Sequence, residues 1–312
     1  MLISVNPNAG ARSGGYRIVR LVRLLTASGL HAQVFTDLNE VAGAANRYSG
    51  QGTLRALVGA GGDGTAAELV NRTEPGVPLA MLPLGTENLL AKYLRQRPTP
   101  EAVCRTIRDG LSVRLDAGVA NGRTFLLMAG CGFDAEVVRR LHDSRRGHIH
   151  HTSYFKPILS TIRSYEYPPL RVYCDRQPSG GQPTVTACWL FAFNLPRYGG
   201  GLQFAPDAVG SDGLLDVCTF RRGSFWHGLR YLAHLICRRH ARLADCVTTR
   251  TARLRVESDR PVPYQLDGDP GGWLPLDVEV VPERLCLVVP RAWATAQGCA
   301  LPAEVATGSE RK

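Results

Sequence analysis

Lysine is scarce in this chain of 312 residues: Lys92, Lys156 and Lys312 are the only three, and every other basic residue is arginine. A P-loop needs the pattern G-x-x-x-x-G-K-[ST], which is absent, so the sequence excludes a P-loop nucleotide-binding domain. A V-A-I-K lysine followed by H-R-D and D-F-G is also absent, which excludes a protein kinase.

Patterns typical of zinc sites and disulfide frameworks are lacking as well. The nine cysteines are scattered without a C-x-x-C pair, and none lies at metal-ligand spacing from a histidine. Such an irregular, odd-numbered set in a chain of this length indicates reduced thiols in a cytosolic protein. We therefore expect no structural zinc.

A long hydrophobic run is missing too. The longest uncharged, strongly apolar stretch, residues 184–196, is too short to span a bilayer and ends in proline. The first residues begin directly with a strand-like segment and carry no basic stretch before an apolar one, so we expect no secretory signal. These features predict a cytoplasmic protein, peripheral at the inner membrane surface at most.

The composition provides a core and a strong positive charge. Hydrophobic residues make up 44% of the chain and charged residues 21%, as in globular proteins, and the length favours two domains. The net charge of +10 suits an anionic partner such as a nucleotide, an acidic lipid surface or a nucleic acid.

The pattern changes along the chain. Residues 1–112 alternate short apolar runs with segments of helical period, which predicts an α/β nucleotide-binding domain with a parallel-type sheet. Residues 113–292 are mostly strands with polar turns and predict a mainly antiparallel β-sandwich as the second domain. Residues 293–312 are expected to form a C-terminal tail. The expected strands of the first domain are Leu2–Val5, Ala32–Phe35, Leu54–Val58 and Leu79–Leu82.

Three loops follow strands of the predicted first domain: Asn6–Gly10, Gly61–Thr65 and Leu84–Asn88. Ligands bind at the carboxyl edge of an open α/β sheet, so all three could face one crevice. Glycines let backbone N–H groups approach phosphate oxygens, and the N-terminus of the following helix favours an anion. Asp63 supplies a hard oxygen for Mg²⁺, and Thr65 a hydroxyl group. Taken alone, a short glycine motif is explained equally well as an ordinary turn between strand and helix.

Six motifs in order carry a resemblance to a known family. With them the chain resembles the lipid kinases that have a diacylglycerol-kinase catalytic domain of the bacterial type, which are related to sphingosine and ceramide kinases. GGDGT alone also occurs in NAD kinases and phosphofructokinases, but the set of six is specific. The motifs are VNPNAG at 5–10, GGDGT at 61–65, LPLGTEN at 82–88, GCGFDAEV at 130–137, YGGGLQFAPDAVGSDGLLDV at 198–217 and QLDGD at 265–269.

The resemblance implies a fold like that of NAD kinase and diacylglycerol kinase, and phosphorylation of a lipid hydroxyl with ATP and Mg²⁺. A lipid at a membrane surface is the implied partner; homo-oligomers are possible, and no nucleic acid is expected. By the same resemblance, Asp212 and the carbonyl oxygens of Val209 and Leu214 match a structural Mg²⁺ site, and Asp63 lies near the catalytic Mg²⁺. The residues expected to hold ATP are Asn6, Pro7, Asn8, Ala9, Gly10, Thr36, Gly61, Gly62, Asp63, Gly64, Thr65, Ala66, Ala67 and Thr86.

Asp267 and Asp269 stand where the family has Asp-Gly-Glu, whose last carboxylate is taken as the base for the substrate hydroxyl. Asp269 is one methylene shorter than that glutamate, so a water could bridge the gap, or Asp267 could take the role. Ala67 and Leu89 replace an asparagine and an aspartate that are common in the family, and each removes one polar contact. These departures suggest an unusual substrate or rate, with impaired catalysis as the alternative.

One predicted helix, Ser224–Arg242, interrupts the strands of the second domain. It could dock on a bilayer, or pack on the sheet with a solvated basic face. Its residues Phe225, Leu229, Leu232 and Ile236 share one face, and Arg230, Arg238, Arg239 and Arg242 lie elsewhere. A second basic cluster is better explained as a flexible loop than as a metal or headgroup site, because no carboxylate or cysteine accompanies it. It consists of Arg145, Arg146, His148, His150 and His151.

The sequence thus predicts a kinase with ATP between two domains, in which positioning and electrostatics supply most of the catalysis. Diacylglycerol, a sphingoid base, ceramide and an undecaprenyl- or glycerol-based lipid all stay open as substrates. One alternative is a kinase of a soluble substrate such as NAD or a sugar phosphate. The other is a catalytically weak lipid-binding or regulatory protein.

Overall fold

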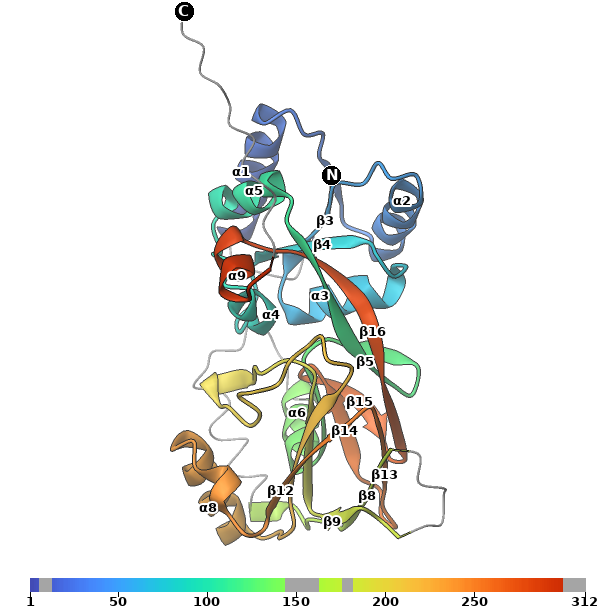
Figure 1. Cartoon of the computed structure of the whole chain (residues 1–312), viewed down its shortest axis with the longest axis vertical. Helices are drawn as coiled ribbons and strands as arrows, with labels where there is room; N and C mark the ends of the chain where they lie inside the picture. The colour runs from blue at the N-terminus through green and yellow to red at the C-terminus, as the bar shows by residue number, and fades with distance from the viewer. Residues whose placement is uncertain (6–12, 144–162, 176–181, 300–312) are drawn as a thin grey trace, which may run out of the picture.

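The computed structural model describes residues 1–5, 13–143, 163–175 and 182–299. The upper part in Figure 1 is built on four parallel strands, which confirms the predicted parallel-type sheet, and their order is β2-β1-β3-β4. Helices α1 and α5 pack on one face of these strands and α2 and α3 on the other. The bounds are β1 (Leu2–Val5), β2 (Gln33–Phe35), β3 (Leu57–Gly61), β4 (Pro78–Pro83), α1 (Ser13–Ala27), α2 (Leu38–Gly50), α3 (Asp63–Arg72), α4 (Leu89–Tyr93) and α5 (Pro100–Asp109).

Strand β3 lies three residues later in the chain than the sequence pattern predicts. Every residue of β3 is buried, because the strand pairs with β1 on one side and β4 on the other. Glycines of the motif region therefore belong to the strand itself, and Gly59 and Gly61 stand where a turn was expected. Pairing on both sides outweighs the weak strand propensity of glycine here.

The lower part is an antiparallel sandwich, which confirms the predicted fold of the second domain. One sheet has the order β12-β11-β10-β7-β14-β15, and its inner face packs against β8 and β13 of the other sheet. The bounds are β5 (Ser112–Ala120), β6 (Arg123–Phe125), β7 (Met128–Gly132), β8 (Leu170–Cys174), β9 (Val185–Ala187), β10 (Trp189–Phe193), β11 (Leu215–Phe220), β12 (Cys246–Thr251), β13 (Arg253–Glu257), β14 (Pro263–Leu266), β15 (Asp269–Trp273) and β16 (Leu276–Val288).

The long strand β16 joins the two parts. It pairs antiparallel with β5 and β13, and at Cys286 and Leu287 its other side pairs in parallel with β4. One ten-stranded sheet therefore runs through the predicted boundary at residues 112 and 113. The range predicted as a tail begins inside α9 (Arg291–Ala296), where Trp293 packs edge-on against Tyr93 with ring centroids 5.7 Å apart.

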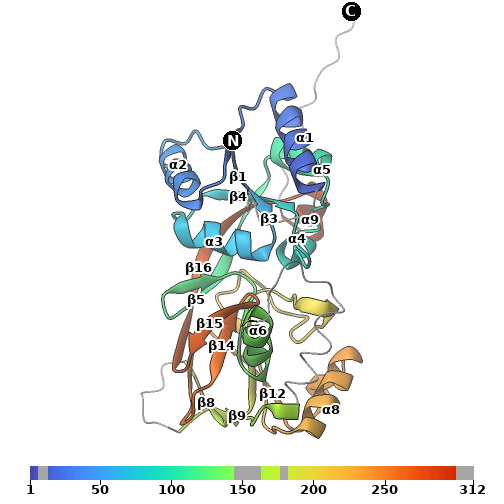
Figure 2. The same ribbon diagram turned by 180° about the vertical axis from the view of Figure 1, so that it is seen from behind.

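Two longer helices cover the second domain. Figure 2 shows α6 (Phe133–Asp143) lying against β14 and β15. The other, α8 (Phe225–Ile236), begins at its cap Ser224 but is shorter than predicted, since Arg238 adopts a positive φ of 55° just after it. Two short 3₁₀ turns, Gly199–Gly201 and His240–Arg242, follow β10 and α8. None of the helices in the described part of the chain has the length and apolar character needed to cross a bilayer. All nine cysteines are free.

Candidate active site

The carboxyl edge of the parallel strands gathers predicted ATP-binding residues. Thr36 follows β2, Gly62 follows β3 and Thr86 lies just after β4, and the strands are parallel, so these residues share one edge. Both threonines are exposed there. The segment Asn6–Gly10, which follows β1 between β2 and β3, lies outside the described residues. The three loops were predicted to face one crevice, and the two that the structure describes do lie at one edge.

The glycine loop is tighter than the motif suggests. Gly61 ends β3 and Asp63 begins α3, so Gly62 alone connects the strand to the helix. Gly62 lies directly against Gly85 of the next loop, where an added Cβ would stand 2.7 Å from the Gly62 Cα. A side chain on either glycine would push these backbones apart. The buried Thr65 folds back over Gly61. This close approach of bare backbone at a helix N-terminus is the kind of cradle that binds phosphate.

Ala66 and Ala67, also predicted as ATP-binding residues, occupy the first turns of α3. Their side chains are 0% and 5% exposed and belong to the core beneath the helix. They therefore point away from the edge where Thr36 and Thr86 lie. The family's asparagine at the position of Ala67 would have to be buried here, which accounts for a small apolar residue in this chain.

Asp63 links the glycine loop to the neighbouring loop. Its Oδ2 accepts a hydrogen bond from Leu89 N at 2.8 Å and its Oδ1 one from Leu90 N at 2.9 Å. These N–H groups open α4, whose own cap residue Asn88 makes no side-chain cap bond. Asp63, the first residue of α3, thus caps the N-terminus of α4. Burial raises the pKa of Asp63, and the two backbone hydrogen bonds oppose that rise. The sequence indicated a ligand for Mg²⁺ at Asp63 but gave no sign of this structural role.

Asp267 forms the turn of the β14–β15 hairpin together with Gly268. Both have positive φ, 52° and 86°, as the favoured two-residue hairpin turn requires. The Asp267 carboxylate accepts hydrogen bonds of 2.7, 2.8 and 3.0 Å from the N–H groups of Leu126, Leu127 and Met128. Burial raises the pKa of Asp267 to about 6, and the negative charge of nearby Asp63 adds to the rise. Both oxygens are thus engaged in holding the chain that enters β7.

Asp269, the first residue of β15, is placed differently. Its Oδ2 lies 3.4 Å from the position that a Cβ on Gly64 would take, so this carboxylate faces the first turn of α3. It makes no hydrogen bond or ion pair with a described residue that would occupy its oxygens. Of the two aspartates predicted as the base, Asp269 therefore has the carboxylate that is available beside the glycine loop. Its assignment as the base stays a prediction.

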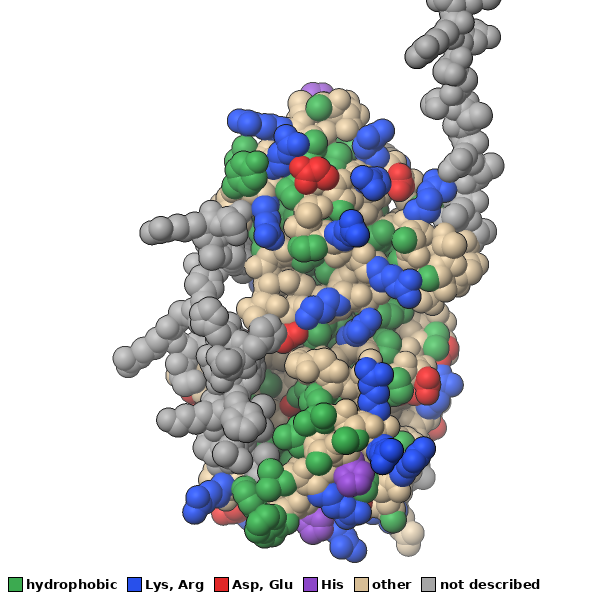
Figure 3. Space-filling view, turned by 90° about the vertical axis from the view of Figure 1, so that its left-hand side faces the viewer, with side chains coloured by type: hydrophobic (Ala, Val, Ile, Leu, Met, Phe, Trp, Pro, Cys, Tyr) green, Lys and Arg blue, Asp and Glu red, His purple; other side chains and the backbone are tan. Residues whose placement is uncertain are grey.

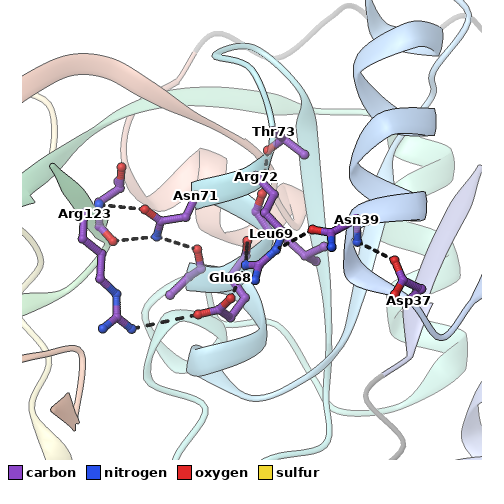
Figure 4. A network of polar contacts seen from close by, with 10 residues as sticks. Asp37, Asn39, Glu68, Leu69, Asn71, Arg72, Thr73 and Arg123 are labelled. Atoms are coloured by element: carbon purple, nitrogen blue, oxygen red, sulfur yellow. Dashed lines mark hydrogen bonds and ion pairs between the residues drawn. The ribbon is translucent and has the colours of Figure 1, made fainter. Parts of the chain in front are cut away.

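A polar network joins α3 to β6, as Figure 4 shows, and Arg123 of β6 extends it to the strand that carries Asp269. Asn71 of α3 exchanges two hydrogen bonds of 2.8 Å with the backbone of Thr124 in β6. The neighbouring Arg123 reaches Glu68 of α3 at 4.0 Å with one nitrogen and donates to the Pro270 carbonyl at 3.3 Å with another. Since Pro270 adjoins Asp269, these contacts fix the first domain and the β15 carboxylate relative to each other.

A second network supports the same hairpin, and the sequence reasoning assigned it no role. Asp134, at the start of α6, accepts hydrogen bonds from the Tyr198 hydroxyl and, at 2.9 Å, from Gln265 Nε2. Gln265 Oε1 accepts in turn from Gly268 N at 2.7 Å. Burial raises the pKa of Asp134. The signal was present, because these residues stand in three of the six motifs, but nothing in the sequence showed that they touch.

The two domains meet at the loop that follows β4. Glu87 in this loop pairs with Lys92 at 3.0 Å, and its other oxygen lies 3.5 Å from the backbone N–H of Gly200, beyond β10. The LPLGTEN and YGGG motifs are therefore neighbours in space. Together with Asp269 against Gly64, this contact brings residues of both domains to one edge of the parallel strands.

The donors present fit an Mg²⁺ ion that is shared with phosphate. No group of three or more His, Cys, Asp or Glu among the described residues is arranged to hold a metal alone. Mg²⁺ in phosphoryl-transfer sites commonly has one or two carboxylate ligands and completes its shell with substrate phosphates and water. Asp269 supplies a free carboxylate of that kind beside the glycine loop, and Asp63 supplies one whose two oxygens each also accept a backbone hydrogen bond.

Asp212 lies in the loop before β11, away from these residues in sequence. Its Oδ1 accepts from Leu214 N at 3.1 Å, and its Oδ2 forms an ion pair with Arg250 of β12. The loop is held from beneath by buried Asp116, which accepts from Gly213 N at 2.8 Å. Val209 is exposed at the other end of the loop. A carboxylate and carbonyl oxygens suit Mg²⁺, but the guanidinium of Arg250 competes for the same carboxylate.

We expect Mg²⁺ to raise the melting temperature, and Arg250→Gln to enlarge that rise, because the substitution removes the competing cation from Asp212. A ligand at one hundred times its Kd stabilises a fold by about 2.7 kcal/mol, and each kcal/mol shifts melting by about 2–4 °C in a protein of this size. Thermal scans in Mg²⁺ and in EDTA measure the rise. Asp212→Ala should abolish it. If the melting temperature is the same in Mg²⁺ and in EDTA for both wild type and Arg250→Gln, Asp212 does not hold a metal ion.

The cluster predicted as a flexible basic loop, residues 145–151, lies outside the described residues.

Comparison with known proteins identifies both parts of the chain. Residues 1–120 match the family described as diacylglycerol kinase catalytic domain, and residues 128–289 match the YegS C-terminal NAD kinase beta sandwich-like domain. A curated diacylglycerol kinase of Mycobacterium tuberculosis (strain ATCC 25618 / H37Rv) is 30% identical over 246 residues, which cover 76% of this chain and 77% of that protein.

Other relatives agree. A diacylglycerol kinase of Bacillus subtilis (strain 168) is 23% identical over 93% of this chain and 96% of its own length. A crystal structure of a putative diacylglycerol kinase from Bacillus anthracis str. Sterne has the same fold, with a TM-score of 0.74, 21% identity, and coverage of 93% of this chain and 97% of that chain.

Proposed function

Since the chain belongs to the lipid kinase family with a diacylglycerol kinase catalytic domain and a YegS-type C-terminal domain, we propose that it transfers the γ-phosphoryl group of ATP to a lipid hydroxyl. Diacylglycerol or a related lipid is the proposed acceptor, offered at the surface of a membrane from the cytoplasmic side. The observation that supports this most strongly is the free carboxylate of Asp269 facing the glycine loop.

The phosphates of ATP would lie along the edge formed by Gly61–Thr65, with Thr36 and Thr86 beside them. The packing of Gly62 on Gly85 keeps side chains out of this space, and the N-terminus of α3 favours negative charge there. Mg²⁺ held by Asp63 and the phosphates would neutralise part of their charge. Asp63 also keeps α4 and its preceding loop against the glycine loop, so it positions Thr86.

Asp269 would accept the proton of the lipid hydroxyl as the hydroxyl oxygen attacks the γ-phosphorus of ATP, the bond from that phosphorus to the β,γ-bridging oxygen breaks, and ADP leaves. The backbone of Asp269 is placed by two neighbours in the chain. Pro270, the next residue of β15, accepts a hydrogen bond from Arg123, and Asp267 and Gly268 form the hairpin turn before it. With one methylene less than glutamate, the carboxylate stands closer to its own strand. Asp269→Glu restores the family's side chain, so it should be tolerated and can increase the rate.

A transfer assay tests the proposal. Purified full-length protein is given ATP labelled at the γ-phosphate, Mg²⁺ and mixed micelles containing one lipid at a time: diacylglycerol, a sphingoid base, ceramide or a polyprenol. We expect label in at least one extracted lipid. Label in NAD or a sugar phosphate instead would favour a soluble-substrate kinase, and vesicle binding without any transfer would favour a regulatory protein.

A further inference from the structure

Helix α8 exposes an apolar face. The side of the helix that packs on the protein consists of Gly228, Tyr231 and Leu235. At about 100° per residue, the opposite side carries four apolar residues and Arg230. Trp226 and Ile236 are 75% and 65% exposed, which puts them among the most exposed large hydrophobic side chains described. We call the four apolar residues the α8 apolar face: Trp226, Leu229, Ala233 and Ile236.

The predicted stripe of Phe225, Leu229, Leu232 and Ile236 does not lie on one side of the protein surface. Phe225 packs against the core, Leu229 and Leu232 are half-buried, and Ile236 is exposed. Tyr231 holds the helix on the protein, with its ring centroid 4.4 Å from that of Phe220 and its hydroxyl donating to Asp245 at 2.6 Å. A helix that is apolar on both sides and still lies at the surface needs a second apolar partner.

Exposed arginines lie in the segments just before and just after α8. Figure 3 shows hydrophobic side chains gathered at the lower end of the molecule with basic side chains beside them. Because α8 ends at Ile236, three of the arginines predicted on the helix lie in the segment after it. Five arginines flank the helix, all exposed and none in an ion pair with a described residue: Arg221, Arg222, Arg238, Arg239 and Arg242.

The charge pattern distinguishes the possible occupants. A second copy docking on the same face would bring two sets of these arginines together around a two-fold axis, and like charges would oppose it. An anionic bilayer offers an apolar interior for Trp226 and Ile236 and phosphate groups for the arginines at the same time. Tryptophan at the boundary between apolar and polar layers is typical of such contacts.

The helix is also connected to the site. From Tyr231 a continuous series of packed rings runs through Phe220, Phe191 and Phe204 to Tyr198, with centroids 4.2 to 6.5 Å apart. The Tyr198 hydroxyl donates to Asp134, which supports the hairpin of Asp269. Packed rings and hydrogen bonds therefore link α8 to the hairpin turn that precedes Asp269.

We propose that α8 lies in the headgroup region of an anionic phospholipid bilayer, with Trp226 and Ile236 inserted and the five flanking arginines on lipid phosphates. The proposal rests on the proposed function only in that the bilayer is where the lipid substrate is found. Binding to vesicles and phosphate transfer are measured separately, so that either can fail alone.

The experiment uses full-length protein and vesicles of phosphatidylcholine with 0% or 30% phosphatidylglycerol, by co-sedimentation. Wild type should bind the anionic vesicles about tenfold more tightly, and salt should reduce the difference. Trp226→Gln with Ile236→Gln should weaken binding about tenfold. The control pair Val19→Gln with Trp273→Gln removes exposed apolar side chains from other surfaces, α1 and β15, and should bind like wild type.

Three further readouts sharpen the result. Arg238→Gln, Arg239→Gln and Arg242→Gln together should weaken binding and raise the KM for lipid in vesicles while leaving the KM for ATP unchanged. Transfer to a water-soluble short-chain diacylglycerol should be unchanged in both sets of variants. Quenching of tryptophan emission by vesicles of brominated lipid should be strong in wild type and mostly lost in Trp226→Phe.

Equal vesicle binding by wild type and the Trp226→Gln, Ile236→Gln variant would overturn the proposal. So would a change from dimer to monomer in that variant without vesicles, which would make the face an interface between copies. Failure of phosphate transfer with normal vesicle binding would refute the proposed kinase activity and leave the docking surface in place.

Discussion

Asp269→Asn should lower the rate of phosphate transfer by about 10²–10⁴-fold, the usual contribution of a general base, without changing the melting temperature. The carboxylate faces Gly64 and makes no hydrogen bond with a described residue, so the fold does not depend on it. The amide keeps the shape of the side chain but cannot accept the hydroxyl proton. Initial rates at saturating ATP and lipid, together with a thermal scan, measure both effects.

Asp267 provides the matched comparison two residues earlier. Asp267→Asn keeps an oxygen for Leu127 N and Met128 N and tolerates the positive φ, so it should retain activity to within about tenfold. Asp267→Ala leaves three backbone N–H groups without acceptors and places alanine at φ 52°, which should destabilise the fold by about 2–5 kcal/mol. An inactive Asp267→Asn beside an active Asp269→Asn would reverse the assignment of the base.

The raised pKa of Asp267 predicts that the stability of the fold depends on pH. Its pKa of about 6 in the folded protein lies above the ordinary value for aspartate, about 3.9, so its ionisation opposes folding. The neutral carboxyl of Asp267 therefore contributes fully to the free energy of unfolding below pH 4, and this contribution is lost as the pH rises through 6. The free energy of unfolding of wild type relative to Asp267→Asn should therefore fall across that range in urea titrations. A difference between the two proteins that is constant from pH 4 to 7 would show that the carboxyl is not buried as described.

Asp63→Ala should reduce transfer by at least about 10³-fold, because it removes the carboxylate proposed for Mg²⁺ and the cap that holds α4 against the glycine loop. Loss of the cap alone should destabilise the protein by only about 1 kcal/mol. Rates over a range of Mg²⁺ concentrations and a thermal scan separate the two contributions.

The control for Asp63 is Thr99→Ala, which removes another helix cap, the hydrogen bond from Ala102 N at 3.3 Å, without removing a carboxylate. It should show a similar loss of stability and a normal rate. Near wild-type activity in Asp63→Ala would contradict the ATP site as we place it.

The sequence predicted the fold well because its signals were local. Short apolar runs separated by helical segments define the parallel strands, and β1 lies where the pattern put it. Strand β3 was placed three residues too early, since glycines such as Gly59 carry no strand propensity and enter the sheet only because neighbours pair on both sides. The length of α8 was overestimated because arginines suit a helix interior, whereas Arg238 adopts the left-handed conformation that ends it.

The site could be predicted only as a list of residues. The motifs named Asp63, Asp267 and Asp269 together, and nothing in their spacing told which carboxylate is occupied by backbone N–H groups. The N–H groups come from distant parts of the chain. Leu89, which donates to Asp63, is more than twenty residues away from it, and Leu126, which donates to Asp267, is more than a hundred residues away. The ion pair of Asp212 with Arg250 and the contacts of Arg123 could not be predicted for the same reason. Each joins segments that only the folded sheets bring together.

One reaction tests the central claim most directly. Wild type and Asp269→Asn are each given γ-labelled ATP, Mg²⁺, mixed micelles of the lipids named above and NAD in the same tube, and the label is counted in the extracted lipid and in the aqueous acceptor. Transfer of label to lipid by wild type, its loss in Asp269→Asn, and none in NAD are the result that we expect. Label in NAD, or equal transfer to lipid by both proteins, would contradict the account.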